Sequence, residues 1–504
     1  MVRHIPEKRP VIIGVGQCVH HPKDLAEIKK PLDLIEVAIH RAENDAGLPD
    51  LARKIDTLCL VNILSRSPEG LPSELSHRIN AGPQSESYTW VGATAPQWFV
   101  NRAAERIFKG QTKLALICGG EAFYSRRVEA KIKGGNAWNW GFPAKMPHMV
   151  GDLRDPITPL ELKYGLLLPI HFYPLFENAL RYHEGMSIEG QRQELGEFCS
   201  AFSSIAAKNP YAWFKETKSS DEIVELSSSN RMVSFPYTKS MCSIMEVDQA
   251  AALFLTDAQT ARELGVPKGK LVYLLGSGDA SDIWHVTERV NFYASPSVRE
   301  AADATMGQAG LSLGEIDYLD FYSCFPCAPR ITRNMLGLPK DEPRPLTVTG
   351  GMPYFGGPGN NYSLHAICKM VELLRRNPAK IGLVQALSWF LSKHSVGIYS
   401  GEPGRNPWKP IPAESCHHQK LSPIQGAPVV EEAAGTAHVE TYMLFHDRQG
   451  EAIGGVVVGK LDEGARFLAK LPEDKDILNA MMNQEFIGEK GTVHQRGGFN
   501  IFEP

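Results

Sequence analysis

GATAPQWFVNRAAERIFKGQTKLALIC, residues 92–118, is the stretch of sequence that decides the fold. Apolar residues recur at helical spacing from Phe99 to Phe108, and Gly110 ends the pattern. The preceding Thr94-Ala95-Pro96-Gln97 has the form of a capping box, which predicts the first turn of this helix. The apolar run 114–118 follows directly and predicts a buried strand. A helix that leads into a buried strand indicates an α/β protein.

A similar unit recurs late in the chain. The pattern predicts a helix over 363–376, ended by Pro378, and then a strand over 381–386. Near the N-terminus, the β-branched run 10–17 is broken by glycines and predicts a strand, and a helical pattern over 31–45 follows. Alternating helices and strands predict a layered α/β fold, and the two helix–strand units suggest an internal duplication.

Between the two units lies a long region rich in aromatic, proline and histidine residues. We interpret it as an irregular excursion that covers something, because long loop regions inside compact proteins usually carry function. After a Pro/Gly-rich linker, two strand-like runs flank Asp447-Arg448-Gln449-Gly450 and predict a hairpin in a small β-rich domain. The expected divisions are an N-terminal half (1–122), the excursion (123–239), a C-terminal half (240–405) and the β-rich domain (412–504).

Composition narrows the classes of function. The net charge of −4 arises from well-mixed charges, so we expect neither nucleic acid nor a membrane surface as a partner. The absence of an apolar leader and of any apolar stretch of about 18 residues favours the cytoplasm. Nine scattered cysteines fit a reducing compartment better than a disulfide framework.

Four segments carry a resemblance to the thiolase superfamily, in that family's order. They are Gly92–Gln97, Ser243–Ala251 (SIMEVDQAA), Asp320–Phe325 (DFYSCF) and Gly350–Gly359 (GGMPYFGGPG). The resemblance covers roughly residues 11–400. It implies a five-layered α/β fold of two similar halves, with the excursion covering a coenzyme A site. The chain looks similar to sterol-carrier-protein-type thiolases with an additional, OB-like C-terminal domain.

The resemblance also implies a function and a set of partners. An acyl-CoA thioester is the expected substrate, with no tightly bound cofactor, and a homodimer is a possible assembly. The implied contacts to coenzyme A come from Ser243, Gly356 and Gly357.

The reactive groups of a thiolase are absent from the matching positions. Ala93 stands in the place of the nucleophilic cysteine, Gly357 in the place of the histidine, and Ala386-Leu387 in the segment of the second cysteine. A thiolase needs a thiolate and a base to form its acyl-cysteine. We therefore do not expect that covalent cycle in this chain.

Four other residues are candidates for catalysis. Tyr322 is either an acid–base group, if its pKa is lowered, or a donor to an oxyanion; the alternative is a buried tyrosine with one satisfied hydrogen bond. Cys324 is either a displaced nucleophile or a core residue. His394 is the histidine best placed to replace the missing one, or it has a supporting role. Asn360 either donates to an oxyanion or serves a turn.

Other conspicuous residues favour structural interpretations. Cys324 and Cys327 form a CxxC pair without a second pair, and the adjacent Cys416-His417-His418 is typical of a solvated linker, so no metal site is expected. Trp138, Trp140 and Phe142 are expected to pack the excursion.

Three functions follow as alternatives. The first is an acyltransferase or Claisen-type enzyme acting on acyl-CoA. The second is a retro-aldol lyase for β-hydroxyacyl-CoA that uses Tyr322. The third is a non-catalytic CoA-ester-binding or assembly protein.

Overall fold

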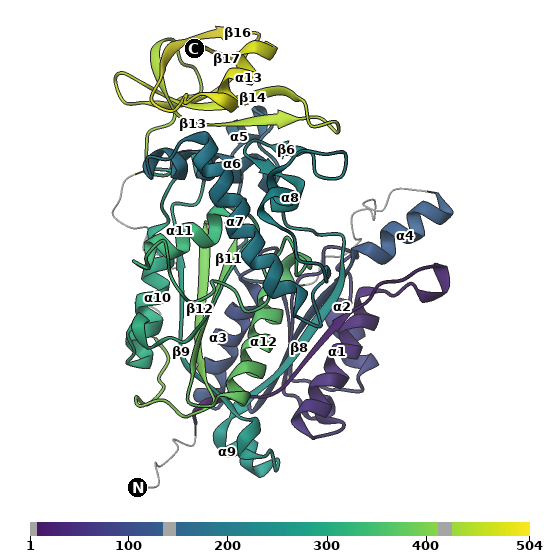
Figure 1. Ribbon diagram of the computed structural model, residues 1–504. Coiled ribbons are helices and arrows are strands. Elements are labelled where there is room, and N and C mark those ends of the chain that lie inside the picture. Colours follow the sequence, from purple (N-terminus) through teal and green to yellow (C-terminus); the bar gives the residue numbers. More distant parts are fainter. Residues whose placement is uncertain (1–7, 135–147, 412–425) are drawn as a thin grey trace.

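A computed structural model describes residues 8–134, 148–411 and 426–504, and a ten-stranded mixed sheet forms its centre (Figure 1). The strands of this sheet are β1 (Pro10–Val19), β2 (Thr57–Leu60), β3 (Ser85–Thr89), β4 (Leu114–Ala122), β5 (Met149–Val150), β8 (Asp248–Asp257), β9 (Val272–Ser281), β10 (Tyr318–Phe321), β11 (Ile381–Ser388) and β12 (Lys393–Ser400). Their order is β10-β11-β12-β9-β1-β8-β4-β2-β3-β5.

The sheet contains the same arrangement twice. In the first half β1 pairs antiparallel with β8, β8 antiparallel with β4, and β4 parallel with β2. In the second half β9, β12, β11 and β10 repeat these three pairings in the same sense. The halves join where β1 and β9 run antiparallel, at Val11 opposite Tyr273 and Ile12 opposite Val272. The predicted internal duplication is therefore confirmed.

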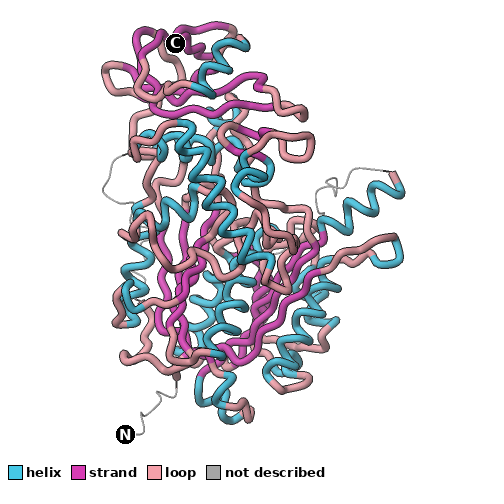
Figure 2. Tube along the Cα trace, viewed as in Figure 1, coloured by secondary structure: helices cyan, strands magenta, loops and turns pink. Residues whose placement is uncertain are grey.

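Helices on both faces make five layers, as predicted. The outer helices are α1 (Pro31–Ala46) and α10 (Pro296–Ala309), and the central pair is α3 (Ala95–Phe108) and α12 (Tyr362–Arg376). Figure 2 shows the central pair between the two parts of the sheet. Gly14 in β1 approaches the Ala42 carbonyl of α1, and Gly276 in β9 approaches the Thr305 carbonyl of α10, where a Cβ would overlap the carbonyl oxygen. Glycine thus lets each outer helix lie directly on its strand.

The start of α3 differs from the capping box that the sequence predicts. The Thr94 side chain makes no capping bond. Its hydroxyl lies 2.7 Å from Ser388 Oγ, and its N–H donates to the same oxygen at 2.7 Å. Gln97 instead accepts from the Tyr399 hydroxyl at 2.8 Å. The prediction was wrong because side chains from the second half, distant in sequence, compete for this helix end.

The excursion is more helical than expected. Its helices and hairpin are α4 (Phe123–Lys133), α5 (Pro159–Lys163), α6 (Pro169–His183), α7 (Ile188–Ala207), α8 (Ser220–Val224), β6 (Met232–Ser234) and β7 (Tyr237–Thr238). Most of α6 is buried, including Glu177, which pairs with Arg330 at 2.5 Å. Pro174 lies inside this helix, and its buried residues include the charged Glu177 and Arg181, so the sequence does not show an ordinary helical pattern. Trp138, Trp140 and Phe142 lie outside the described residues.

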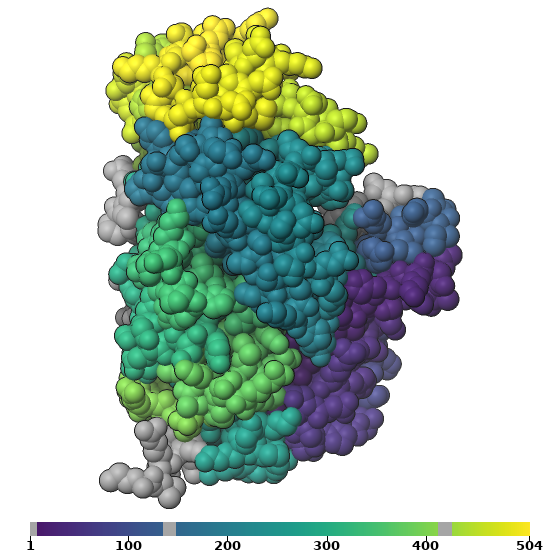
Figure 3. Space-filling view, in the orientation of Figure 1, coloured from purple at the N-terminus to yellow at the C-terminus, as the bar shows by residue number. Residues whose placement is uncertain are grey.

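The C-terminal part is a closed five-stranded barrel, which confirms the predicted β-rich domain and its hairpin. Its elements are β13 (Gly435–His446), β14 (Ala452–Leu461), β15 (Arg466–Lys470), α13 (Lys475–Asn483), β16 (Lys490–Arg496) and β17 (Phe499–Glu503). The strand order β13-β14-β15-β17-β16 is OB-like. The barrel rests on the excursion (Figure 3). There Thr441 Oγ1 donates to the Leu175 carbonyl of α6 at 2.7 Å.

Three further short α-helices lie in the described ranges: α2 (Leu71–Arg78), α9 (Ala258–Glu263) and α11 (Cys327–Met335). Strand β8 follows the excursion in sequence but pairs with β1 and β4 of the first half. We propose that the first half includes β8 and that the second half begins at β9. Cys416, His417 and His418 lie outside the described residues. Within the described ranges, no helix is both long and apolar enough to cross a membrane.

Candidate functional site

A cavity of about 440 Å³ lies where the two halves meet the first turn of α6. All four segments that carry the family resemblance reach it. The lining residues are Leu64, Val91, Gly92, Ala93, Leu168, Pro169, Ile170, Tyr173, Val233, Cys242, Ser243, Met245, Tyr322, Cys324, Phe325, Met352, Gly357, Gly359, Asn360, Leu387 and Trp389. We refer to it as the central cavity. Its volume suits a small organic ligand or part of a larger one.

Most of the predicted site residues meet in the central cavity. Five of them line it together: Ser243, Tyr322, Cys324, Gly357 and Asn360. Two others do not line it: Gly356 and His394. Gly356 instead packs against the Gln249 side chain, where a Cβ would overlap Oε1.

The loop before α3 is fixed by side chains of the second half. The Gly92 N–H donates to Asn360 Oδ1 at 2.9 Å, and Ser363 Oγ donates to the Ala93 carbonyl at 2.9 Å. Ser388 holds the next residue. Ala93 thus lies in an ordered position at a helix N-terminus, where a cysteine thiolate would be stabilised. The side chain there is a methyl group.

Asn360 is committed to holding this loop. Its amide nitrogen donates to the Asn62 carbonyl at 3.1 Å and lies 3.3 Å from Asn62 Oδ1. The Asn360 amide therefore faces Gly92 and Asn62, and this geometry favours a positioning role over donation to an oxyanion.

Ser243 occupies the space that a histidine at position 357 would need. A Cβ on Gly357 would overlap Ser243 Oγ and lie 3.0 Å from the Met352 methyl group. Ser243 Oγ is buried and has no hydrogen-bond partner within the described ranges. An uncommitted hydroxyl therefore lies beside Gly357 at the cavity wall.

Tyr322 presents a neutral hydroxyl to the cavity. Its N–H donates to the Gln385 carbonyl at 3.1 Å, which fixes the backbone, while its hydroxyl has no partner among the residues described. Burial, and secondarily the nearby Cys324 and Tyr362, raises the pKa of Tyr322 well above its ordinary value. The direction is opposite to the lowered pKa that a base requires, so Tyr322 is suited to donate a hydrogen bond.

Cys324 is a protonated thiol near neutral pH. Burial raises its pKa to about 12, against a smaller lowering by its hydrogen bond with Tyr173. Burial likewise raises the pKa of Cys242 to about 12. Because the described lining contains no carboxylate, imidazole or amine side chain, the central cavity has no group that is ionised at neutral pH.

His394 faces away from the central cavity and is fully buried. Its Nδ1 accepts from Gln385 Nε2 at 2.9 Å, and its Nε2 lies 3.0 Å from Ser295 Oγ, which donates to Asp282 at 2.7 Å. Burial lowers the pKa of His394. Both ring nitrogens are thus occupied outside the lining of the central cavity, because β12 turns this side chain toward Ser295 at the start of α10.

Trp389 is a lining residue that sequence reasoning missed. It has a φ of +55°, an uncommon conformation for a residue with a bulky side chain. Its carbonyl accepts from the Tyr173 hydroxyl at 2.9 Å, and its buried Nε1 has no partner within the described ranges. Strain of this kind clusters at functional sites, but a positive φ at tryptophan has no signature in sequence.

Glu121, also missed, lies directly behind the cavity wall. Its carboxylate accepts from the N–H groups of Leu64 at 2.7 Å and Ser65 at 2.8 Å, and a Cβ on Gly359 would overlap it. Burial raises its pKa to about 7, although these hydrogen bonds act in the opposite direction. The only signal for it is an acidic residue at the end of a buried strand.

Comparisons with known proteins agree with this geometry. The family model "Thiolase-like protein type 1 additional C-terminal domain" matches residues 418–498. A monomeric SCP2-thiolase-like protein type 1 from Mycobacterium smegmatis has a TM-score of 0.85 and 31% identity, and the match covers 99% of this chain and 100% of that chain. The Ltp2-ChsH2(DUF35) aldolase has a TM-score of 0.61 and 17% identity, over 79% of this chain and 99% of that chain, and so shares the fold.

Curated relatives match over a shorter length. An acetyl-CoA acetyltransferase of Schizosaccharomyces pombe is 28% identical over 136 residues, which are 27% of this chain and 31% of the relative. The chain thus spans about a third of the length of the curated relatives it matches.

Proposed function

The chain belongs to the thiolase superfamily, as an SCP2-thiolase-like protein of type 1, and on this premise we propose that it binds an acyl-CoA thioester in the central cavity without forming an acyl-enzyme. The observation that carries the proposal is the lining of that cavity. It is largely apolar, and its polar groups include the neutral hydroxyls of Ser243 and Tyr322. Such a lining accommodates an uncharged thioester and offers donors to its carbonyl oxygen.

The chemistry of the lining argues against covalent transfer. A thiol with a pKa of about 12 is ionised to only about one part in 10⁵ at pH 7, and Cys324 has no base beside it among the described lining residues. Acyl transfer and Claisen condensation both need a nucleophile or base. We therefore favour the binding function over the acyltransferase that the resemblance suggests.

In the proposed complex, Tyr322 donates its hydroxyl hydrogen to the thioester carbonyl. Its raised pKa keeps the proton on the oxygen throughout the neutral range. Ser243 Oγ is the second uncommitted donor, and Asn360 keeps the Gly92 loop in place. We propose that the protein needs no tightly bound cofactor and that coenzyme A binds only as part of the ester.

Retro-aldol cleavage of a β-hydroxyacyl-CoA is a second candidate. The uncommitted Tyr322 hydroxyl favours it, and an aldolase shares the fold. This reaction must remove the proton of the substrate hydroxyl, however, and the direction of the Tyr322 pKa opposes that step. Cleavage of a β-hydroxyacyl-CoA by the wild-type protein, together with its loss in a Tyr322→Phe variant, would support the lyase.

We further propose that the chain acts as a monomer in a reducing compartment such as the cytoplasm. Strand β5 pairs with β3 through Tyr88–Met149 and Thr89–Val150, so the end of the β3 edge is covered within the chain and a second copy cannot pair there. The relative from Mycobacterium smegmatis is described as monomeric. The eight cysteines in the described residues are all free. Light scattering in line with gel filtration tests the proposal, and a mass of twice 55.7 kDa would contradict it.

Two measurements on the wild-type protein test the proposed function. Calorimetric titration with acetyl-CoA should show saturable binding with one site. Intact-mass spectrometry after incubation with acetyl-CoA should show the unmodified chain mass. An added acetyl group on Cys324 would replace the proposal with covalent acyl transfer, and the absence of binding would remove it.

A further inference from the structure

A second cavity, of about 510 Å³, lies on the other side of the loop before α3. Gly92 lines both cavities, so the loop forms a shared wall. The lining residues come from the end of β3, the start of α3, the segment after β5 and the start of β12. They are Thr89, Trp90, Gly92, Thr94, Ala95, Trp98, Arg102, Val150, Gly151, Asp152, Arg154, Lys393, His394 and Ser395. We call this space the lysine cavity.

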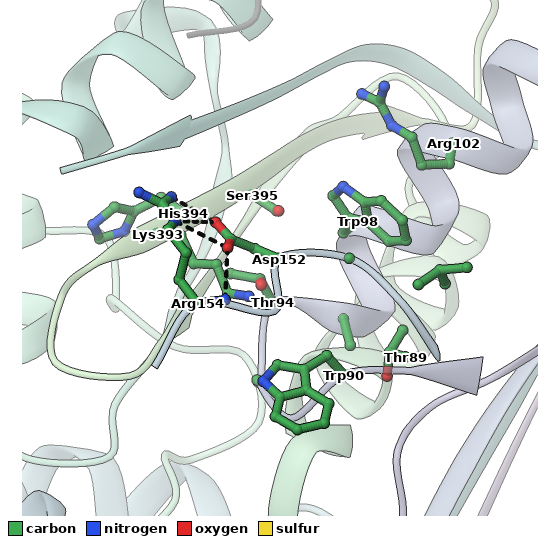
Figure 4. Close-up of a pocket in the computed structure, with 14 residues that line it drawn as sticks. Thr89, Trp90, Thr94, Trp98, Arg102, Asp152, Arg154, Lys393, His394 and Ser395 are labelled. Atoms are coloured by element: carbon green, nitrogen blue, oxygen red, sulfur yellow. Dashed lines mark hydrogen bonds and ion pairs between the residues drawn. The ribbon is translucent and has the colours of Figure 1, made fainter. Parts of the chain in front are cut away.

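The charges of the lysine cavity leave one cation uncompensated. Asp152 and Arg154 neutralise each other through an ion pair of 2.6 Å and a second bond from Nε (Figure 4). Arg102 pairs with Asp279 at 2.9 Å. Lys393 Nζ, by contrast, has neither a hydrogen bond nor an ion pair within the described ranges; it lies over the Trp284 ring, 5.9 Å from the ring centroid.

The position of Lys393 is built into the fold. Lys393 begins β12, where it pairs with Ser388 of β11 across the hairpin. A Cβ on Gly92 would lie 3.2 Å from Lys393 Nζ and 2.9 Å from Ser388 Oγ, so glycine leaves room for the amine beside the loop. Burial lowers the pKa of Lys393 to about 8, while Asp152 raises it and Arg154 lowers it. The amine is thus poorly hydrated and remains mostly cationic at neutral pH.

Aromatic surface lies across from this cation. Trp90 and Trp98 are half-buried and turn part of their rings to the cavity. Figure 4 shows Trp98 on the side opposite Lys393, Asp152 and Arg154. Indole rings present flat apolar area that packs well against an aromatic or otherwise planar ligand.

We propose that the lysine cavity is a second binding site, for an organic anion with a carboxylate or phosphate group on an aromatic or similarly flat body. The anionic group pairs with Lys393 Nζ, which has no ion-pair partner within the described ranges. The flat body lies against Trp90 and Trp98. A poorly hydrated ammonium gains more from such a pair than an exposed lysine does. The site is separate from the central cavity and does not depend on the function proposed for it.

Benzoate and phenyl phosphate are suitable probes, with benzyl alcohol as the uncharged control. Calorimetric titration of the full chain should detect one or both anions, with binding of the alcohol at least about tenfold weaker. Lys393→Met should weaken anion binding by at least about tenfold, because it removes the cation and keeps the apolar stem. Lys490→Met, at an exposed lysine, is the matched control and should bind as the wild type does. Equal binding of anions and alcohol, or an unchanged Lys393→Met, would overturn the proposal.

A second measurement uses the unaltered protein, in case the variant folds poorly. Acetic anhydride labelling with peptide mapping should show that benzoate or phenyl phosphate protects Lys393 but leaves Lys490 as reactive as before. Lack of protection would overturn the proposal.

Discussion

Removal of the Tyr322 hydroxyl separates ligand binding from folding. This hydroxyl has no partner among the described residues, so Tyr322→Phe leaves no buried group unsatisfied and should change stability by less than about 1 kcal/mol. The buried Tyr237 hydroxyl, by contrast, donates to Glu177 Oε2 at 2.8 Å. Tyr237→Phe should therefore cost about 1.5–3 kcal/mol.

These costs convert to modest shifts in thermal unfolding. For 504 residues the unfolding entropy is about 1 kcal/mol per kelvin, so Tyr237→Phe should lower Tm by about 1.5–3 °C and Tyr322→Phe by less than about 1 °C. In binding, the lost hydrogen bond to the thioester carbonyl is worth about 0.5–1.5 kcal/mol, which is a rise in Kd of about 2- to 13-fold.

Acetyl-CoA and free coenzyme A form a matched pair of ligands, because free coenzyme A lacks the carbonyl. Calorimetry should show weaker binding of acetyl-CoA to Tyr322→Phe and unchanged binding of coenzyme A, while Tyr237→Phe binds both as the wild type does. Equal loss for both ligands, or none for acetyl-CoA, would refute the proposed hydrogen bond. A Tm loss in Tyr322→Phe as large as in Tyr237→Phe would show that the hydroxyl is structural.

Three further changes test other parts of the structure. Gly357→Ala forces its Cβ onto Ser243 Oγ, so it should lower the free energy of unfolding by about 1–3 kcal/mol and weaken acetyl-CoA binding. The control is Gly82→Ala, where a Cβ meets nothing within 4 Å. It should change neither the Tm in thermal scans nor the Kd in calorimetry. Glu121→Gln replaces a carboxylate oxygen, which accepts a hydrogen bond from a backbone N–H, with an amide group that donates. It should lower the free energy of unfolding by about 1–3 kcal/mol. An unchanged midpoint of urea unfolding would contradict this. Burial lowers the pKa of His365 to about 3. Below pH 6.5 the unfolded chain therefore binds a proton at this residue more readily than the folded chain does, and the free energy of unfolding decreases as the pH is lowered. Between pH 7 and pH 5 this residue should account for about 2 kcal/mol of the decrease in the free energy of unfolding. Urea titrations at the two pH values should show a decrease that is smaller by about that amount in a His365→Gln variant.

Most of the fold was predictable because local patterns agree with the tertiary structure. The apolar periodicity after Phe99 and the glycines of β1 correspond to a real helix face and a real helix–strand contact. Helix α6 was not predictable, since Pro174 lies inside it and its buried residues include the charged Glu177 and Arg181. The start of α3 was mispredicted because its partner, Ser388, is 294 residues away in sequence.

The sequence predicted which residues meet in the candidate site better than it predicted their chemistry. Motif order brought Tyr322, Cys324 and Asn360 to one cavity, because each segment ends a strand or begins a helix at the junction of the halves. The direction of a pKa depends on burial and on neighbours from distant segments, which short motifs do not contain. For the same reason, nothing in the sequence around His394 indicates that its ring turns to Ser295 and away from the cavity.

A crystal structure of the chain with bound acetyl-CoA tests the central claim most directly. The claim predicts the thioester in the central cavity, its carbonyl oxygen within hydrogen-bond distance of the Tyr322 hydroxyl and Cys324 unmodified. A thioester bound elsewhere, or an acetyl group carried by Cys324, would contradict it.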